Sequence, residues 1–245
     1  MQAYRWLIRC GVLVVVLAGA ALAADNVVLV TSQASQGSND SASWSSAGKD
    51  GSVLGASFSL TSTNKMAITA SLQGANSVTS VVCPASSCSW TTSANGIKAG
   101  DTLLWTSDAG AGGNGPLTLN FATSVSGVGA SLQADAPGPF TASLQVFNGA
   151  TSLGSFTVKS DASGNPVYIG ALDKTASKIT SAVFSVTGCA AVCSDFAIDT
   201  LSMNEPVADY SMSGTTAGAI DAGQTATYTV TVTPAAGFHQ PVSLA

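Results

Sequence analysis

The stretch Phe140-Thr141-Ala142-Ser143-Leu144-Gln145-Val146-Phe147 decides the fold class of this chain. Apolar side chains occupy every second position from Phe140 to Val146, and hydroxyl or amide side chains lie between them. Successive side chains of a β-strand point to opposite faces, so this stretch predicts a strand with one face in a core and the other in water.

The same alternation recurs along the first 200 residues, between clusters of Gly, Asn, Asp, Ser and Pro. Such a pattern is typical of antiparallel strands joined by turns. Further strands are predicted at Val27–Thr31, Val53–Leu60, Ala67–Leu72, Val78–Cys83, Thr102–Thr106, Leu117–Phe121, Val128–Gln133, Leu153–Val158, Val167–Leu172, Ile179–Val186 and Phe196–Met203. No stretch predicts a helix, and Gln33–Gly51, rich in Ser, Asn and Gly, is predicted to be a long surface loop anchored by Trp44. An all-β antiparallel sandwich is therefore expected.

The N-terminal residues have the pattern of an export signal. Arg5 and Arg9 precede an uncharged apolar run, Gly11–Ala21, which ends in the small-residue site Ala21-Leu22-Ala23. The run is shorter than the roughly 20 residues of a membrane-spanning helix. We therefore expect residues 1–23 to be a cleaved signal peptide, the protein to be secreted or on the cell surface, and no membrane insertion after cleavage.

The charge balance argues against nucleic-acid partners. Without residues 1–23 the chain has no arginine, and six lysines stand against thirteen acidic residues. Proteins bind nucleic acid mainly by neutralising phosphates with Lys and Arg. Nucleic acid and anionic membrane surfaces are therefore not expected as partners, and the sequence leaves the oligomeric state open.

Four cysteines lie outside the signal segment, as two close pairs, Cys83 with Cys88 and Cys189 with Cys193. An exported protein with an even number of cysteines is expected to form disulfides, and local pairing is the simplest of three connectivities. A zinc site of four thiolates is the alternative, although the spacings differ from the C-x-x-C pairs of zinc ribbons.

A second unit is predicted after the last strand of the sandwich. Residues 204–207, beginning Asn-Glu-Pro, are predicted to be a linker, and strand patterns resume at Ala208–Ser213 and Thr225–Thr233. The stretch DAGQTATYTVTVTPAAGFHQPVSL, residues 221–244, resembles the opening of immunoglobulin-like repeats of large bacterial surface proteins. An Ig-type sandwich needs about 100 residues, so the resemblance implies an incomplete Ig-like β-domain over residues 208–245.

The first domain, residues 24–203, carries a looser resemblance. The patterns FNG at 147–149, TSLGSF at 151–156, VYIG at 167–170 and DFAIDTL at 195–201 resemble the jelly-roll domains of exported bacterial proteins that often bear a PEP-type C-terminal sorting signal. This resemblance implies a jelly-roll-like sandwich at the cell surface or in the extracellular matrix.

Asp199 is the candidate cation ligand of the first domain. Period two places it on one strand face with Ala197, Leu201 and Met203, and a carboxylate among apolar neighbours needs donors or a cation. The jelly-roll resemblance makes Asp199 a candidate ligand of a structural calcium ion, with Asp25 as a second candidate. The alternative is a partly solvated Asp199 capped by backbone amides.

The sequence predicts no catalytic residues. A Ser-His-Asp triad needs an imidazole, and His239 in the incomplete repeat is the single histidine, with no G-x-S-x-G elbow in the chain. A glycosidase needs two facing carboxylates, but Asp195 and Asp199 lie four residues apart on one strand face, roughly 13 Å by strand rise.

Two tryptophans could contact a ligand. Trp105 lies in a predicted strand and is expected to pack in the core, whereas Trp90, in the loop beside Cys88, is the candidate for binding a sugar ring. The sequence thus predicts a non-catalytic surface or matrix protein with a structural, adhesive or recognition role. A carbohydrate-binding module that meets extracellular glycans or matrix components is the alternative, and a glycan-acting hydrolase a more distant one.

Overall fold

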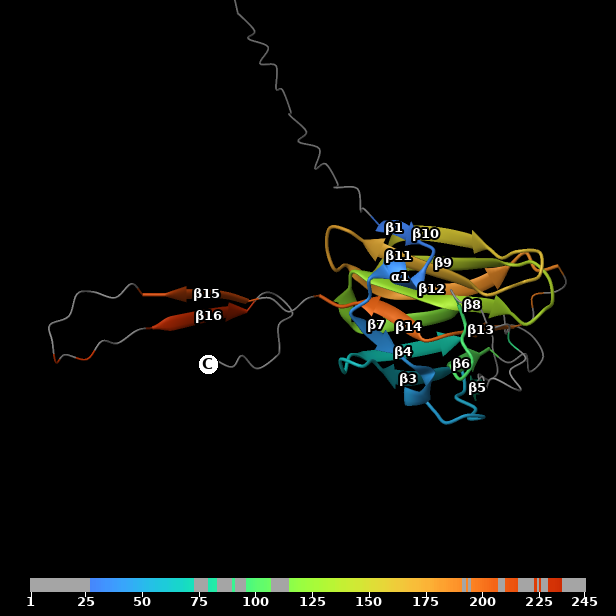
Figure 1. Cartoon of the computed structure of the whole chain (residues 1–245), viewed down its shortest axis with the longest axis horizontal. Helices are drawn as coiled ribbons and strands as arrows, with labels where there is room; N and C mark the ends of the chain where they lie inside the picture. The colour runs from blue at the N-terminus through green and yellow to red at the C-terminus, as the bar shows by residue number, and fades with distance from the viewer. Residues whose placement is uncertain are drawn as a thin grey trace, which may run out of the picture.

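The computed structural model places more than half of the residues that it describes in antiparallel strands (Figure 1). It describes residues 27–72, 79–82, 90, 96–106, 115–190, 193, 195–206, 210–215, 223, 225 and 229–234. The predicted signal peptide lies outside the described residues. In the part of the chain that the model describes, no helix has the length and apolar character needed to cross a bilayer.

Two sheets form the sandwich. Sheet A contains β1 (Val27–Val30), β2 (Asp40–Ala42), β5 (Thr79–Val82), β6 (Thr102–Trp105), β8 (Gly127–Ala134), β11 (Val167–Asp173), β13 (Phe196–Ile198) and β14 (Leu201–Asn204). Its order is β1-β11-β8-β13-β6-β5, and β14 pairs with both β8 and β2. Sheet B has the order β10-β9-β12-β7-β4-β3, with β3 (Ser57–Thr61), β4 (Ala67–Leu72), β7 (Leu117–Val125), β9 (Thr141–Asn148), β10 (Thr151–Lys159) and β12 (Ile179–Thr187). The all-β sandwich predicted from period-two patterning is confirmed.

The core lies between the two sheets and takes alternate residues from each strand. In the stretch that opened the sequence argument, Phe140, Ala142, Leu144 and Val146 are buried, with at most 2% of any of them exposed. Their neighbours Ser143 and Gln145 are half-buried and exposed, on the outer face of sheet B. The predicted facing of this strand is therefore confirmed.

Strand β8 departs from this alternation, because all eight of its residues are buried. Its inner side chains enter the core, and its outer face is covered by Tyr168 of β11 and by Gln36 of α1 (Gln33–Gln36). A Cβ on Gly129 would lie 2.8 Å from Tyr168 Cζ and would overlap the tyrosine hydroxyl. Glycine is needed at position 129 because an aromatic ring lies directly on the backbone.

The segment predicted as a long loop, Gln33–Gly51, instead contains α1, β2 and the short 3-10 helix η1 (Trp44–Ser46). Here the prediction was wrong, because long-range hydrogen bonds order the segment. The side-chain amide of Asn204 donates to the carbonyls of Gln36 and Gly37, and Gln36 Nε2 donates to Asn204 Oδ1 at 2.9 Å. The predicted anchoring by Trp44 is confirmed, since its side chain is fully buried.

Strands β15 (Tyr210–Gly214) and β16 (Val230–Pro234) form a separate two-stranded sheet. The first matches the strand predicted at Ala208–Ser213, and the second is the described part of the strand predicted at Thr225–Thr233. The sandwich itself extends beyond its predicted end. Asn204 belongs to β14 and pairs with Gly127, so the first residue of the predicted linker is part of sheet A.

Candidate functional site

The outer face of sheet A carries a second apolar cluster, distinct from the core of the sandwich. This outer cluster consists of Trp90, Ile97, Leu103 and Ala197, with Trp105 packed against them. Trp90 and Trp105 meet edge to face, with ring centroids 6.3 Å apart and planes at 67°. Trp105, predicted to lie in the core, therefore packs on the opposite side of its strand from the core residue Leu104.

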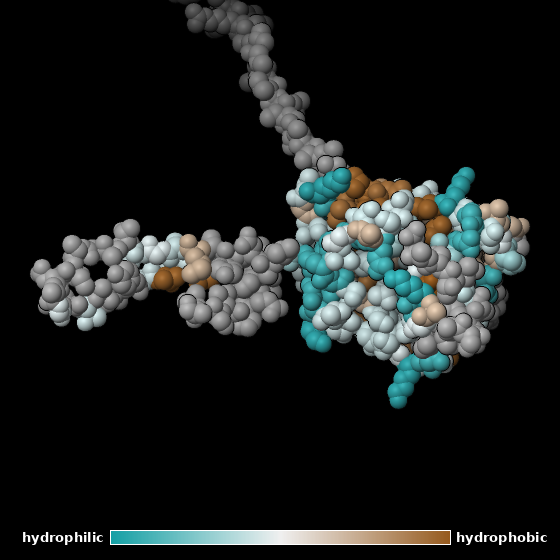
Figure 2. Space-filling view, in the orientation of Figure 1, coloured by the Kyte–Doolittle hydropathy of each residue, from teal (hydrophilic) through white to brown (hydrophobic). Residues whose placement is uncertain are grey.

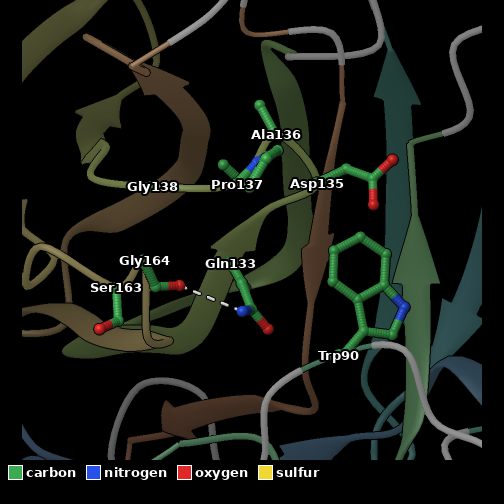
Figure 3. A pocket seen from close by; sticks show the side chains of 9 residues that line it. Trp90, Gln133, Asp135, Ala136, Pro137, Gly138, Ser163 and Gly164 are labelled. Atoms are coloured by element: carbon green, nitrogen blue, oxygen red, sulfur yellow. Dashed lines mark hydrogen bonds between the residues drawn. The ribbon is translucent and has the colours of Figure 1, made fainter.

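A pocket of about 180 Å³ opens beside Trp90 (Figure 3). Trp90 and Asp135 lie on one side of it, and Ser163 and Gly164 on the other. Gln133 lies between them and its Nε2 donates to the Gly164 carbonyl at 3.1 Å. The lining consists of Trp90, Gln133, Ala134, Asp135, Ala136, Pro137, Gly138, Ser163 and Gly164. No lysine or arginine is among these lining residues.

The pocket is shaped where the turn at residues 161–165 meets the segment after β8 that contains Gly138. The Asp161 carboxylate accepts hydrogen bonds from the backbone N–H groups of Ser163 and Asn165, at 3.0 and 3.1 Å, and these bonds lower the pKa of Asp161. Residues 161–165 therefore form a turn held by the Asp161 side chain. A Cβ on Gly164, where φ is +73°, would overlap the Gly138 carbonyl. The turn and this segment can therefore meet only because residue 164 has no side chain.

A pair of carboxyl groups stands at the edge of this pocket. Asp135 follows β8 and its backbone N–H donates to the Asp195 carbonyl at 3.0 Å, so the two residues face each other on adjacent strands. Asp195 is only 2% exposed. Burial first, then the charge of Asp195 and a hydrogen bond between the two carboxyls, raise the pKa of Asp135. Such a pair holds a proton to a higher pH than an isolated aspartate does.

Asp199 lies at a bulge between β13 and β14. Ile198 pairs with Leu132 and Ser202 with Gly129, so residues 199–201 of one strand oppose only residues 130–131 of the other. The extra residue reverses the facing of everything beyond it. Ala197 faces the outer cluster, whereas Leu201 and Met203 enter the core. The predicted common face of Asp199 with Leu201 and Met203 was therefore wrong.

The Asp199 carboxyl has a second carboxyl as its neighbour. Its Oδ1 accepts the Thr200 backbone N–H at 2.6 Å, and its backbone carbonyl accepts the Trp44 indole N–H at 3.0 Å. Burial raises the pKa of Asp199 to about 7; the Thr200 amide opposes this, and the adjacent charge of Asp101 adds to it. This combines features of both sequence hypotheses: Asp199 is capped by a backbone amide, and it also lies beside a second oxygen-bearing group.

The remaining predicted site residues divide into observed and undescribed ones. Cys189 and Cys193 form the predicted disulfide, with Cα atoms 5.4 Å apart, which excludes a zinc site built on these two thiolates. Cys83, Cys88, Asp25 and His239 lie outside the described residues. Among the residues that are described, no group of three or more His, Cys, Asp or Glu side chains gathers at one place.

Sequence reasoning identified Trp90 but missed Gln133, Asp135 and the pairing of Asp195. Asp195 and Asp199 do not face each other, because each meets a carboxyl from another strand or loop. The one sequence feature that could have indicated these pairs is the Asp-x-x-x-Asp spacing of Asp195 and Asp199, which flank β13. The carboxyl that each of them meets depends on strand register, which the spacing does not give. Comparisons with protein-family models, with curated proteins and with solved structures found no match to this chain.

Proposed function

We propose that this protein is a non-catalytic module of the bacterial cell surface or extracellular matrix, and that its sandwich recognises glycans by taking one sugar ring into the Trp90 pocket. The observation that carries the proposal is the composition of that pocket. The Trp90 indole, which is 7% exposed, the Gln133 side-chain amide and the Asp135 carboxyl line a cavity of about 180 Å³. A sugar ring offers apolar C–H surface, which packs on an aromatic ring, and hydroxyl groups, which hydrogen-bond to amides and carboxyls.

The charge of the pocket favours an uncharged ligand. Its lining includes one carboxyl, Asp135, with Asp195 directly behind it, and no cationic side chain. A phosphate, a sulfate or an acidic sugar would meet only like charge here. Hydroxyl groups, in contrast, can donate to a carboxylate in hydrogen bonds of roughly 1.5–3 kcal/mol each.

The spacing of the carboxyls supports binding rather than hydrolysis. Glycosidases hold their two carboxyls about 5–5.5 Å or 6.5–9.5 Å apart, so that a sugar carbon or a water fits between them. Asp135 and Asp195 are in hydrogen-bonding contact, which leaves no room for either. Asp199 pairs with Asp101 in the same way.

An exterior location rests on three features. The signal-like segment at residues 1–23 and the resemblance to exported jelly-roll proteins come from the sequence. The Cys189–Cys193 disulfide fits the same compartment, because disulfides persist outside the reducing cytosol.

A glycan array probed with the chain lacking residues 1–23 tests the proposal. We expect binding to one class of neutral glycan, and Asp135→Asn should weaken it roughly tenfold through loss of a charge-assisted hydrogen bond. Trp90→Phe tests the aromatic wall while keeping much of its packing in the outer cluster. Gln145→Ala, an exposed change on the outer face of sheet B, is the matched control and should bind as the unaltered chain does. No detectable binding to any glycan on the array, or equal binding by Asp135→Asn and the unaltered chain, would refute the pocket as a sugar site.

A structural or adhesive role is the second candidate, and the outer face of sheet B favours it. Along β9, Thr141, Ser143 and Gln145 point outward, and the positions opposite them on β12 are Thr187, Ser185 and Val183. On β4 and β7 the pairs Thr69 with Asn120 and Ser71 with Thr118 continue this mainly hydroxyl and amide face. Lys159 is the one charged side chain on the strands of sheet B. Figure 2 shows the opposite side of the sandwich, where α1, β8 and β14 lie nearest the viewer, and there hydrophobic and hydrophilic patches interrupt the residues of intermediate hydropathy.

The outer face of sheet B could contact hydroxylated surfaces without electrostatic steering. Retention on insoluble polysaccharide that is lost in Ser143→Lys but kept in Asp135→Asn would support this role over the pocket. The reverse result would exclude it.

A further inference from the structure

Four polar residues meet where the chain leaves the sandwich. Asn39 precedes β2 and Asp40 begins it, Asn64 lies in the turn between β3 and β4, and Glu205 follows the last residue of β14. We refer to these four residues as the linker-root cluster. Glu205 N–H donates to Asn39 Oδ1 at 2.8 Å, and Asn39 Nδ2 donates to the Glu205 carbonyl at 3.1 Å. Segments more than 160 residues apart in sequence are thus fixed side by side.

Asp40 brings a buried oxygen without a donor to this cluster. The residue is only 5% exposed, and its Oδ1 accepts the Asn64 backbone N–H at 3.0 Å. Its Oδ2 is buried and has no hydrogen-bond partner. A carboxylate oxygen removed from water in this way costs free energy unless a proton, a donor or a cation meets it.

The group that does lie near Asp40 is a second carboxyl. Burial raises the pKa of Glu205; the side chain of Asn64 opposes this, and the neighbouring Asp40 carboxyl adds to it. Two ionised carboxylates have no hydrogen to share. The repulsion between the two charges is relieved either by a proton held on one of the carboxyls or by a cation between them.

Neutral polar groups surround the same point. Asn64 Nδ2 donates to Glu205 Oε2 at 3.2 Å and to the Asn39 carbonyl at 3.4 Å. The two ends of an amide differ only in which atom is nitrogen, and the hydrogen-bond network decides the assignment. Without a cation the network places the Asn64 nitrogen here, because both of its neighbours are acceptors; a bound cation would replace these two hydrogen bonds and favour the turned amide, with Oδ1 beside the Glu205 oxygen and the Asn39 carbonyl. Two carboxylates, a side-chain amide and a backbone carbonyl form the kind of oxygen set that calcium takes.

We infer that the linker-root cluster binds a calcium ion through the carboxylates of Asp40 and Glu205, with Asn39 and Asn64 supplying neutral oxygens. Calcium fits better than magnesium because it tolerates irregular oxygen sets completed by water, whereas magnesium demands near-ideal octahedral geometry. With only two carboxylates, the affinity falls in the range of extracellular modules, with a dissociation constant on the order of 10⁻⁴–10⁻³ M. The ion would join β2, the β3–β4 turn and the residue after β14, stiffening the exit of the chain toward the C-terminal region.

Thermal unfolding of the purified chain tests this inference. At pH 7.5, after removal of metal by a chelator, calcium chloride should raise the melting temperature by several degrees with a half-effect near millimolar concentration, because a ligand of the native state stabilises it by mass action. Magnesium chloride at equal concentration should give a clearly smaller shift. No response of the unaltered chain to calcium would overturn the inference.

Variants separate this site from others. Asp40→Asn and Glu205→Gln should each abolish the calcium response, and Glu205→Gln, at a half-buried position, is informative even if Asp40→Asn does not fold. Asp161→Asn changes an exposed turn carboxylate and should respond as the unaltered chain does. Asp199→Asn distinguishes the site implied by the jelly-roll resemblance. A calcium shift that persists in Glu205→Gln, or that vanishes only in Asp199→Asn, would refute the linker-root cluster as the site.

Discussion

Replacing Asp199 by asparagine should stabilise the sandwich at neutral and alkaline pH. In the folded protein, burial and the adjacent Asp101 raise the pKa of Asp199 from the ordinary 3.8 to about 7. A group whose pKa is higher in the folded than in the unfolded state holds its proton longer when folded. Stability therefore falls as pH rises from about 4 to about 7, and the full penalty is present above pH 7.

The magnitude follows from the size of this change. The difference between 3.8 and about 7 corresponds to about 4 kcal/mol at 1.36 kcal/mol per pH unit. Because the Asp199 side chain is partly exposed, solvent screening reduces this value, and we expect about 2 kcal/mol. Asparagine keeps an oxygen for the Thr200 N–H and offers a donor to Asp101. The variant should thus be about 2 kcal/mol more stable at pH 8 and nearly equal at pH 4.

Urea unfolding followed by tryptophan fluorescence between pH 4 and pH 8, in the presence of a chelator, measures this difference. Asp135 and Glu205 also have raised pKa values, so the stability of both the unaltered chain and Asp199→Asn depends on pH through these groups. Only the difference in unfolding free energy between the two proteins reports on Asp199. Asp161→Asn is the control of opposite sign, since hydrogen bonds lower that pKa and its charged form stabilises the fold at neutral pH. A stability difference for Asp199→Asn that is the same at pH 4 and pH 8 would refute the reasoning.

Three further changes test the packing of the sandwich, each by chemical or thermal unfolding. Gly129→Ala should cost about 1–3 kcal/mol because its Cβ overlaps the Tyr168 ring, and an unchanged midpoint would contradict that contact. Replacing Cys189 and Cys193 together by serine should cost at most about 2 kcal/mol, since the disulfide closes a very short loop; loss of folding would show a larger role. Trp44→Phe should cost about 1–3 kcal/mol, because it leaves the buried carbonyl at the bulge without its indole donor, and a neutral result would show that water replaces that donor.

Period-two patterning predicted the sandwich because the burial of alternate residues depends on local sequence alone. The strand Ala67–Leu72 is found with the predicted bounds, and the apolar face of Phe140–Val146 enters the core. Each of these strands has only to bury one of its two faces, and it can do so whichever register the neighbouring strands adopt. Their facing is therefore readable from single residues.

The parts that sequence could not predict depend on contacts between distant segments. Asp199 was assigned to the wrong set of neighbours because a single extra residue between Ile198 and Ser202 changes the facing, and no residue type marks that bulge. The order in Gln33–Gly51 depends on Asn204, more than 160 residues away. Trp90 could be proposed from its type and loop position, whereas Asp135 becomes a pocket residue only through the register that places it opposite Asp195.

Three carboxyl pairs lie at different points of sheet A: Asp135 with Asp195 beyond one end of β8, Asp101 with Asp199, and Asp40 with Glu205 toward the other end of β8. Among the residues that the structure describes, no lysine is one of the groups that shift the pKa of Asp135, Asp199 or Glu205. Each pair must then hold a proton, accept the cost of repulsion or bind a cation. The unpartnered oxygen of Asp40 distinguishes the third pair from the other two. At neutral pH in the presence of calcium, we therefore expect Asp40 and Glu205 to respond to the metal and Asp199 to respond to pH.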